Sequence, residues 1–297
     1  MVCLGTYLYA WNLARNGYGN EYYAAAVLSM TRSWHAFAYG ALDAVGFITV
    51  DKPPFAFWIQ ALSARVFGFG AWSILLPQSV ATLATVLIVF GLTRRTFGSL
   101  AALVGAAMLL LTPISVAMAR ENLPDPMLVL LLVAGAWATL EAVRTGRLRW
   151  LLLGAVMVGL GFNTKMLQAY VVVPSLFLTY LTLAPGGWRR RISHLAAAGA
   201  VLAVVSAAWV VTVHGTPPDQ RPYIGGSRTN SVLELVVGEN GLGRILGRNA
   251  SAVLSNVAPQ LAGVTPSGGG LGANLGGAAG WDRLFNAQVG AQISWWC

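Results

Sequence analysis

The chain contains two lysines, Lys52 and Lys165, and each lies in a short polar motif beside a long apolar segment. In VDKPP, residues 50–54, the two prolines can open a helix and hold the preceding residue extended, which predicts Asp51 and Lys52 on a membrane surface just before that helix. A lysine in this position can bind a lipid phosphate as a compact point charge. The alternative is an Asp–Lys pair that only terminates a helix, and the scarcity of lysine favours the functional role.

A second polar motif, RENLPDP at residues 120–126, forms a turn between two apolar segments, and Asp125 lies at the start of the second. A carboxylate there can stabilise the helix dipole and cap free amides, or it can bind a sugar hydroxyl or accept a proton. The residues alone leave both roles open. In FNTK, residues 162–165, snorkelling of the lysine to the membrane interface would explain Lys165 without any function.

The first long polar segment adds four candidate residues, Asn20, Glu21, His35 and Asp43. A lone histidine is more often structural than catalytic. The sequence holds no HExxH, CxxC or GxSxG motif and no phosphate-binding glycine loop in a credible context. Soluble hydrolase and nucleotide-binding chemistry therefore find no support in the motifs.

Composition places these motifs in a membrane protein. Hydrophobic residues make up 56% of the chain and charged residues 10%, and the mean hydropathy is +0.64, whereas roughly a quarter of residues are charged in soluble domains. Apolar segments recur along the chain, so we expect an all-α, polytopic transmembrane helical bundle. The net charge of +9 comes from short arginine clusters between apolar segments rather than from one basic face, which argues against nucleic-acid binding.

The arginine clusters predict the topology. They occupy alternate connections, at residues 94–95, 144–149 and 189–191, and by the positive-inside rule these lie in the cytoplasm. The other connections then face outward, and of the ten acids only Glu141 falls on the arginine side. Both lysines also fall on the outer side. Any chemistry is therefore expected at the extracytoplasmic face of a multi-pass protein of the plasma membrane.

This topology divides the chain into two parts. Residues 1–213 are expected to form a membrane domain of about six spans with the first outer loop at 14–52. That loop should hold juxtamembrane helices at 20–31, capped by Asn20, and at 33–42, and the segment 53–68 should lie along the outer interface. Residues 214–297 are expected to form an outer loop, with a short helix over 231–246 and a glycine-rich stretch at 265–280, that ends before a further span.

Taken together, the motifs resemble polytopic glycosyltransferases of the GT-C class, families 39 and 83, which hold protein O-mannosyltransferases and the aminoarabinose transferases of lipid A. The resemblance covers nearly the whole chain, and four segments carry it: NEYYAAAVLSM, GFITVDKPPFAFWIQALSARVFG, RENLPDP and GLGFNTKMLQAY. SRTNSVLELVVGENGLGRI and LFNAQVGAQISWW look like the outer loop of actinobacterial members. The combination of an acid followed by KPP with a downstream RxxxxD turn is fairly specific to this group.

The resemblance implies transfer of a mannose- or arabinose-like sugar from a polyprenyl-phosphate donor, with inversion, to a hydroxyl of a protein, lipid or cell-wall glycan. It implies that Lys52 contacts the donor phosphate, that Lys165 is a second basic contact, and that Asp125 is the acid of the second outer turn. Asp51 takes the acidic position of the KPP motif, which leaves a divalent metal open as a cofactor. Arg120 and Asn20 are added as substrate-binding candidates.

One position departs from the family pattern. Better-known relatives carry an acidic pair at the start of the first amphipathic helix, whereas Asn20, an amide that cannot act as a base, stands in or beside that position here. Glu21, Asp43 or Asp51 could supply the base instead, and the sequence does not choose among them.

Two other functions remain open at this point. A lipid-linked sugar transporter or flippase would carry charged or helix-breaking residues near the middle of its spans, whereas these spans are clean. An inactive, truncated family member is the second alternative, because residues 1–13 are apolar but too short to cross a bilayer and residues 292–297 look like the approach to another membrane helix.

Overall fold

The computed structural model describes residues 1–237 and is built from helices. In this part of the chain the β-structure consists of two isolated bridges, Ala41 with Thr49 and Ile48 with Tyr223. The helical elements are α1 (Val2–Ala10), η1 (Leu13–Asn16), α2 (Glu21–Arg32), α3 (Trp34–Tyr39), α4 (Phe55–Phe67), α5 (Ala71–Leu111), α6 (Pro113–Ala119), α7 (Asp125–Thr145), α8 (Leu148–Lys165), η2 (Met166–Val172), α9 (Val173–Leu183), α10 (Trp188–Gly215) and α11 (Val232–Glu234). The all-α prediction is confirmed.

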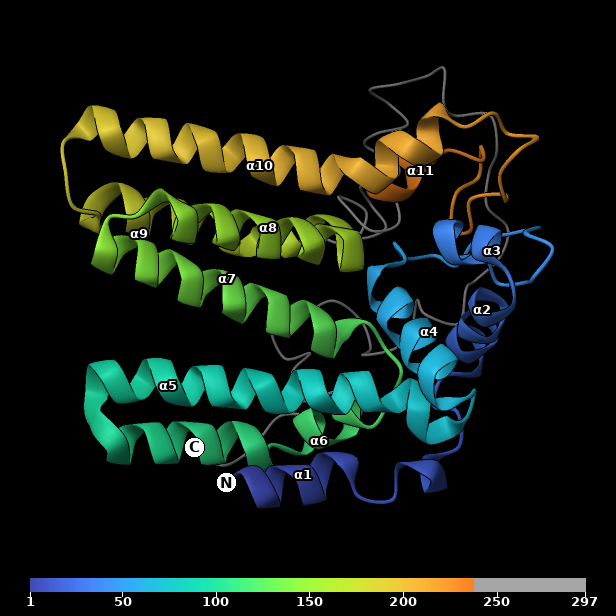
Figure 1. Ribbon diagram of the computed structural model, residues 1–297, viewed down its shortest axis with the longest axis horizontal. Coiled ribbons are helices and arrows are strands. Elements are labelled where there is room, and N and C mark those ends of the chain that lie inside the picture. Colours follow the sequence, from blue (N-terminus) through green and yellow to red (C-terminus); the bar gives the residue numbers. More distant parts are fainter. Residues whose placement is uncertain (238–297) are drawn as a thin grey trace, which may run out of the picture.

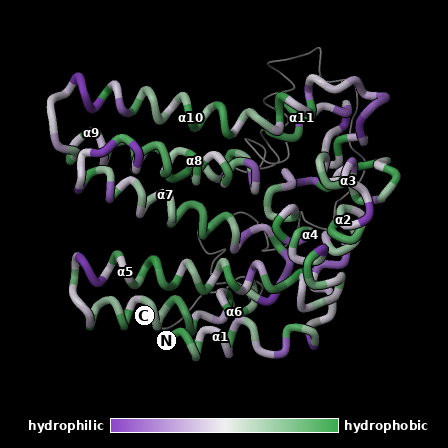
Figure 2. The backbone as a smooth tube through the Cα atoms, viewed as in Figure 1, coloured by the Kyte–Doolittle hydropathy of each residue, from purple (hydrophilic) through white to green (hydrophobic). Residues whose placement is uncertain are grey.

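The long helices α5, α7, α8, α9 and α10 form a bundle whose axes run roughly along one direction (Figure 1). Four segments are long and apolar enough to cross a membrane, at 71–111, 125–145, 148–183 and 188–215. Figure 2 shows hydrophobic residues along these helices and hydrophilic segments at both ends of the bundle. This arrangement is that of a multi-pass membrane protein.

Two of the four segments reverse direction inside their length. Gly98 interrupts α5 with φ 85° and ψ 177°, a backbone conformation open mainly to glycine, and the chain turns back there (Figure 1). The residues that follow α8 form the 3₁₀ helix η2, after which α9 returns along the bundle. The number of spans, about six by sequence, stays a prediction, because no membrane boundary fixes which of these passes crosses completely.

Small residues allow the bundle helices to approach closely. A Cβ on Gly154 of α8 would lie 3.1 Å from the carbonyl oxygen of Gly135 in α7, and 3.0 Å from the hydroxyl of Thr139. Glycine at this crossing brings two backbones into contact, and that is how membrane helices gain packing energy without a hydrophobic driving force between them. Larger side chains here would push α7 and α8 apart.

The arginine-bearing turns gather at one end of the bundle, and Glu141 lies among them. Its side chain is 7% exposed, forms an ion pair with Arg95 of α5, and accepts a hydrogen bond of 2.8 Å from Nε of Arg144. A carboxylate is tolerated in this buried place because two guanidinium groups face it. Glu141, which the charge pattern places on the same side as the arginines, therefore joins α5 to α7.

Helices α2 and α3, which lie in the segment 14–52, lie across the opposite end of the bundle (Figure 1). Helix α2 begins after Asn20, whose side chain accepts a hydrogen bond of 3.2 Å from the amide of Tyr23, so the predicted cap is confirmed. Val27 and Met30 are buried with Tyr23, as the helical spacing predicted. Helix α3 ends at Tyr39, three residues earlier than predicted, because the following glycine takes a left-handed conformation.

The segment after α10 folds back onto the residues that precede the KPP motif. The Tyr223 amide donates to the carbonyl of Phe47 at 2.9 Å, and the Thr49 amide donates to Tyr223 at 2.8 Å. The Gly225 amide donates to Oγ1 of Thr49 at 2.9 Å, and a Cβ on Gly225 would lie 2.0 Å from the Thr49 carbonyl oxygen. Only glycine fits there. The rest of the tail helix predicted over 231–246, beyond residue 237, and the glycine-rich stretch at 265–280 lie outside the described residues.

Candidate active site

The KPP motif forms the first polar group of the site. Lys52 is 3% exposed, pairs with the carboxylate of Asp51, and also donates to the Asp51 carbonyl at 3.3 Å. The other carboxylate oxygen of Asp51 accepts a hydrogen bond of 3.1 Å from the Tyr23 hydroxyl. That Lys52 lies at the membrane surface stays a prediction; within the protein its ammonium group is buried, and the adjacent carboxylate makes that burial tolerable.

Tyr22 adds a second phenol beside this group. Partial burial, and then the negative charge of Asp51, raise the pKa of Tyr22 to about 12, against a smaller lowering by a backbone hydrogen bond with Asp51. The phenol therefore stays neutral at physiological pH and can donate a hydrogen bond. Asp51 thus lies near one ammonium group and two phenol groups.

The second polar group joins the start of α7 to the end of α8. Nζ of Lys165 lies 2.5 Å from Oδ1 of Asp125, and the side chains are 11% and 36% exposed. Lys165 does not simply extend to water at the membrane interface, because its ammonium group is directed at the carboxylate of Asp125, 40 positions away in sequence. The two lysines of the chain are therefore each paired with an acid of a different predicted motif.

Both pairs border one apolar cluster. A Cβ on Gly226 would lie 3.4 Å from the Cβ of Asp51 and 3.0 Å from Cδ1 of Leu235. Leu235 belongs to a buried cluster that also contains residues one turn after Asp125 and directly after Lys165. The buried members of the cluster are Leu128, Phe162, Met166, Ala169, Trp209, Val213, Ile224, Val232 and Leu235. The chain thus brings the KPP motif, the second outer turn and the end of α8 to one end of the bundle.

Arg120 and Asn20 have backbone partners in this structure. The guanidinium group of Arg120 donates to the carbonyls of Leu8 and Trp11, at 3.3 and 2.8 Å, which lie at the C-terminal end of α1. Asn20 caps α2, and its backbone carbonyl and amide both bond to the side chain of Asn122. These contacts give both residues a part in building the site.

Within residues 1–237, neither Asp43 nor Glu21 takes part in either of the two lysine–carboxylate ion pairs. The Asp43 carboxylate accepts hydrogen bonds from the amides of Gly46, Phe47 and Ile48 at 2.8 to 3.3 Å. Burial alone would raise the pKa of Asp43, but these backbone hydrogen bonds outweigh it and hold the pKa below its usual 3.8. Glu21 is exposed in the first turn of α2.

Three residues of the site were not predicted from sequence as site residues, namely Tyr23, Gln60 and Asn122. Tyr23 was expected only in the buried face of α2, and its hydroxyl reaches Asp51. Gln60 is a polar residue inside an apolar helix, which is the one local signal that could have identified it. The contacts of Asn122 carry no local signal, because its side-chain partner, Asn20, is 102 positions away.

The acids of the site do not assemble a metal-binding group. Among residues 1–237, no cluster of three or more histidine, cysteine, aspartate or glutamate side chains has a geometry that could hold a metal ion. Asp51 faces Lys52 and Tyr23 instead. The divalent metal that the resemblance left open therefore finds no ligand set in the described part of the chain.

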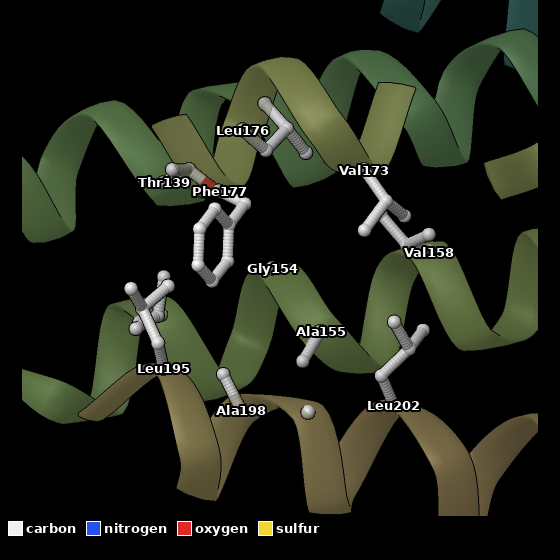
Figure 3. A pocket seen from close by; sticks show the side chains of 12 residues that line it. Thr139, Gly154, Ala155, Val158, Val173, Leu176, Phe177, Leu195, Ala198 and Leu202 are labelled. Carbon is white, nitrogen blue, oxygen red and sulfur yellow. The ribbon is translucent and has the colours of Figure 1, made fainter. Parts of the chain in front are cut away.

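A cavity lies elsewhere in the bundle, between α7, α8, α9 and α10 (Figure 3). Its volume is about 100 Å³, and its lining is apolar except for Thr139, whose hydroxyl donates to the Gly135 carbonyl at 2.9 Å. Figure 3 shows Phe177 and Leu195 pointing toward one another across it. Such a lining suits hydrocarbon and offers nothing to a sugar or phosphate, so the polar end of the bundle is the candidate active site.

The fold and the site together define a multi-pass helical membrane protein of the GT-C glycosyltransferase type, with lysine–carboxylate pairs at one end of the bundle. Residues 51–210, more than half of the chain, match the family model described as "Dolichyl-phosphate-mannose-protein mannosyltransferase". The chain belongs to this family. The matched range begins at Asp51 and includes Lys52, Asp125 and Lys165.

Curated relatives are similar over most of the chain. The Bacillus subtilis protein named "Putative mannosyltransferase YkcB" is 45% identical over 250 residues, which are 84% of this chain and 35% of that protein. "Putative mannosyltransferase YycA" of the same organism is 40% identical over 84% of this chain and 36% of its own length. An undecaprenyl phosphate-alpha-4-amino-4-deoxy-L-arabinose arabinosyl transferase of Pseudomonas savastanoi is 27% identical over 58% of this chain and 33% of that protein. The chain thus spans about a third of the length of these relatives.

Solved structures share the fold. The crystal structure of ArnT from Cupriavidus metallidurans bound to undecaprenyl phosphate covers 74% of this chain and 41% of that chain, with 25% identity and a TM-score of 0.57. The apo form of the same protein covers 68% of this chain and 38% of that chain, with 25% identity and a TM-score of 0.54. The resemblance to the GT-C class is thereby confirmed.

Proposed function

We propose that the chain carries part of the active site of a membrane glycosyltransferase, which moves a mannose- or arabinose-like sugar from a polyprenyl-phosphate donor to an acceptor hydroxyl. One observation carries this proposal. Lys52 and Lys165, the two lysines of the chain, lie at the same end of the bundle, each largely buried and each facing a carboxylate of a different motif. The acceptor is a protein, a lipid or a cell-wall glycan.

Lys52 and Lys165 are suited to the donor phosphate. In the reaction the bond between the anomeric carbon and the phosphate oxygen breaks, and polyprenyl phosphate leaves with the electron pair. A fixed ammonium group stabilises the negative charge that develops on the leaving phosphate. An arriving phosphate competes with Asp51 and Asp125 for these ammonium groups. The undecaprenyl phosphate bound in the similar ArnT structure supports a donor of this chemical class.

The acceptor hydroxyl must lose its proton to a carboxylate as its oxygen attacks the anomeric carbon. Asp43 is the least suitable base, because backbone hydrogen bonds lower its pKa. Asp51 and Asp125 are each paired with a lysine. Glu21 is exposed at the start of α2, and within residues 1–237 it forms no ion pair. We therefore assign the base to Glu21 and the orientation of the sugar hydroxyls to Asp125.

The distribution of charge supports the proposed side of the membrane. The arginine-bearing turns and the two lysine–carboxylate pairs lie at opposite ends of the bundle. Cytoplasmic ends of membrane helices carry the excess of arginine, and this supports the proposal that the polar end lies at the extracytoplasmic face of a protein in the plasma membrane.

A transporter of lipid-linked sugars is the competing function. It needs its substrate site near the middle of the bundle. Here Asp125 is the first residue of α7 and Lys165 the last residue of α8, while Asp51 and Lys52 lie just before the start of α4. Both pairs are therefore at helix ends, and this favours the enzyme.

The test uses the full-length gene product in membranes, supplied with radiolabelled polyprenyl-phosphate mannose or aminoarabinose. We expect label to appear on an acceptor, and we expect Lys52→Ala or Asp125→Asn to abolish that transfer while leaving membrane insertion intact. Full activity of both variants would overturn the site. Label that crosses the membrane but stays on its lipid carrier would identify a transporter, and neither transfer nor transport would indicate an inactive family member.

A further inference from the structure

Asn122 lies in the turn that leads into α7, and its side chain is completely buried. A buried amide is costly unless its donors and acceptor find partners. Oδ1 of Asn122 accepts a hydrogen bond of 2.7 Å from the Asn20 amide, and Nδ2 donates one of 3.0 Å to the Asn20 carbonyl. The side chain thus binds both backbone groups of a single residue, as a neighbouring β-strand would.

The backbone of Asn122 makes a third connection. Its carbonyl oxygen accepts a hydrogen bond of 3.0 Å from Nε2 of Gln60, another completely buried amide. Gln60 lies in α4, the helix that the KPP motif opens. Asn122 is therefore bonded to the N-terminal end of α2 and to α4, and it stands three residues before Asp125.

The contact between the turn and the first outer loop is close enough to require glycine. Gly19 has φ +68°, and a Cβ there would lie 2.9 Å from Oδ1 of Asn122 and 3.2 Å from its backbone nitrogen. The left-handed backbone of Gly19 brings the Asn20 amide directly onto the Asn122 side chain.

We propose that Asn122 is a positioning residue for sugar transfer, which holds the carboxylate of Glu21 and the Asp125–Lys165 pair in fixed relation across the site. This inference rests on the proposed function for its catalytic part. Asn122 itself touches neither substrate nor the reacting atoms. Its three hydrogen bonds fix the relative placement of α2, α4 and α7, and an error of about 1 Å between catalytic groups can cost about 100-fold in rate.

The kinetic test compares Asn122→Ala with a matched control, Ser79→Ala. Ser79 is also buried, and its hydroxyl lies 2.8 Å from the carbonyl oxygens of Tyr9 and Ala119, so it joins α5 to α1 and α6 without a hydrogen bond to Asn122 or its partners Asn20 and Gln60. In full-length protein we expect Asn122→Ala to lower kcat by about 10- to 100-fold with the donor KM nearly unchanged. We expect Ser79→Ala to lower stability and leave kcat per folded molecule unchanged. Equal losses of kcat in both variants, or none in Asn122→Ala, would overturn the proposal.

Asn122→Asp adds a second measurement, the pH dependence of kcat, which should not change if Asn122 has a purely structural role. An ionised aspartate can accept from the Asn20 amide but cannot donate to its carbonyl, whereas a protonated one can do both. The ratio of variant to wild-type kcat should therefore rise as pH falls. A ratio that is independent of pH would contradict the proposed hydrogen-bond pair.

A distance measurement separates failure of this inference from failure of the proposed function. Spin labels at Ala25→Cys on α2 and Val129→Cys on α7, with Cys3 and Cys297 replaced by serine, report the relation of the two helices without any substrate. We expect a narrow distance distribution in the otherwise unchanged protein, a broad one with Asn122→Ala and a narrow one with Ser79→Ala. A narrow distribution in Asn122→Ala overturns the positioning role even if transfer is observed. Absent transfer with the expected broadening refutes only the enzymatic function.

Discussion

Replacing Asp125 and replacing Lys165, one at a time, should lower the free energy of unfolding by unequal amounts. At the 2.5 Å separation of Nζ and Oδ1, the gross Coulomb attraction is roughly 6 to 7 kcal/mol with an effective dielectric constant of about 20. The cost of taking the lysine out of water offsets much of this attraction. The unequal exposure of the two side chains, 11% for the lysine and 36% for the aspartate, decides what remains after each substitution.

Asp125→Asn leaves a mostly buried ammonium group without its counterion, and we expect it to lower the free energy of unfolding by about 2 to 4 kcal/mol. Lys165→Met leaves a carboxylate that water can reach, so we expect a loss of about 0 to 1.5 kcal/mol. The double variant should be more stable than Asp125→Asn alone, because no charge is left unpaired. Both substitutions nearly preserve side-chain volume, which limits effects of packing.

The assay is unfolding by a denaturing detergent of protein purified in a mild one, followed by tryptophan fluorescence, with all four members of the double-mutant cycle. If Lys165→Met proves as costly as Asp125→Asn, or if the two losses add in the double variant, the pair does not stabilise the end of the bundle in the way described.

Three other predictions concern the topology, a turn and a titratable group. A cysteine placed at Asp125 should react with an impermeant thiol reagent added outside the cell, and one placed at Arg147 only after permeabilisation; the reverse pattern would invert the topology. Gly225→Ala should be destabilising by more than about 2 kcal/mol, because its Cβ would lie 2.0 Å from the Thr49 carbonyl oxygen; retention of wild-type thermal stability would show that the two segments are not bonded there. The lowered pKa of Asp43 implies a contribution to stability that is present above its unfolded pKa and lost as pH falls through the lower folded value. Asp43→Asn should therefore be less stable than wild type at pH 7 and no less stable near pH 2. A difference in stability that persists in acid would contradict this role.

Local patterns in the sequence were sufficient for much of the fold. The start of α2 at Asn20 follows from capping chemistry, which depends on residues within one turn. The buried face of Tyr23, Val27 and Met30 follows from helical periodicity. Hydropathy and arginine placement predicted a multi-pass bundle with its polar motifs apart from the arginines, because the membrane imposes those constraints on each segment separately.

The partners of the site residues needed the tertiary structure. Asp125 and Lys165 were each predicted as functional, but their pairing joins positions on two helices that only the packing of α7 against α8 brings together. Burial of Lys52 was missed because VDKPP resembles an exposed turn. The segment around Tyr223 returns from beyond α10 and pairs with the residues before this motif, an approach that no local pattern encodes.

The sequence by itself therefore predicted which residue types could carry the chemistry, and it determined that they belong to a helical membrane protein. Only the tertiary structure decided which carboxylate faces which lysine, and that Asn122 joins the turn before α7 to the start of α2. The physical reason is the range of the interactions involved. Helix capping, periodicity and hydropathy act within a few residues, whereas the hydrogen bonds between Asn20 and Asn122 close a separation of 102 residues that no local pattern encodes.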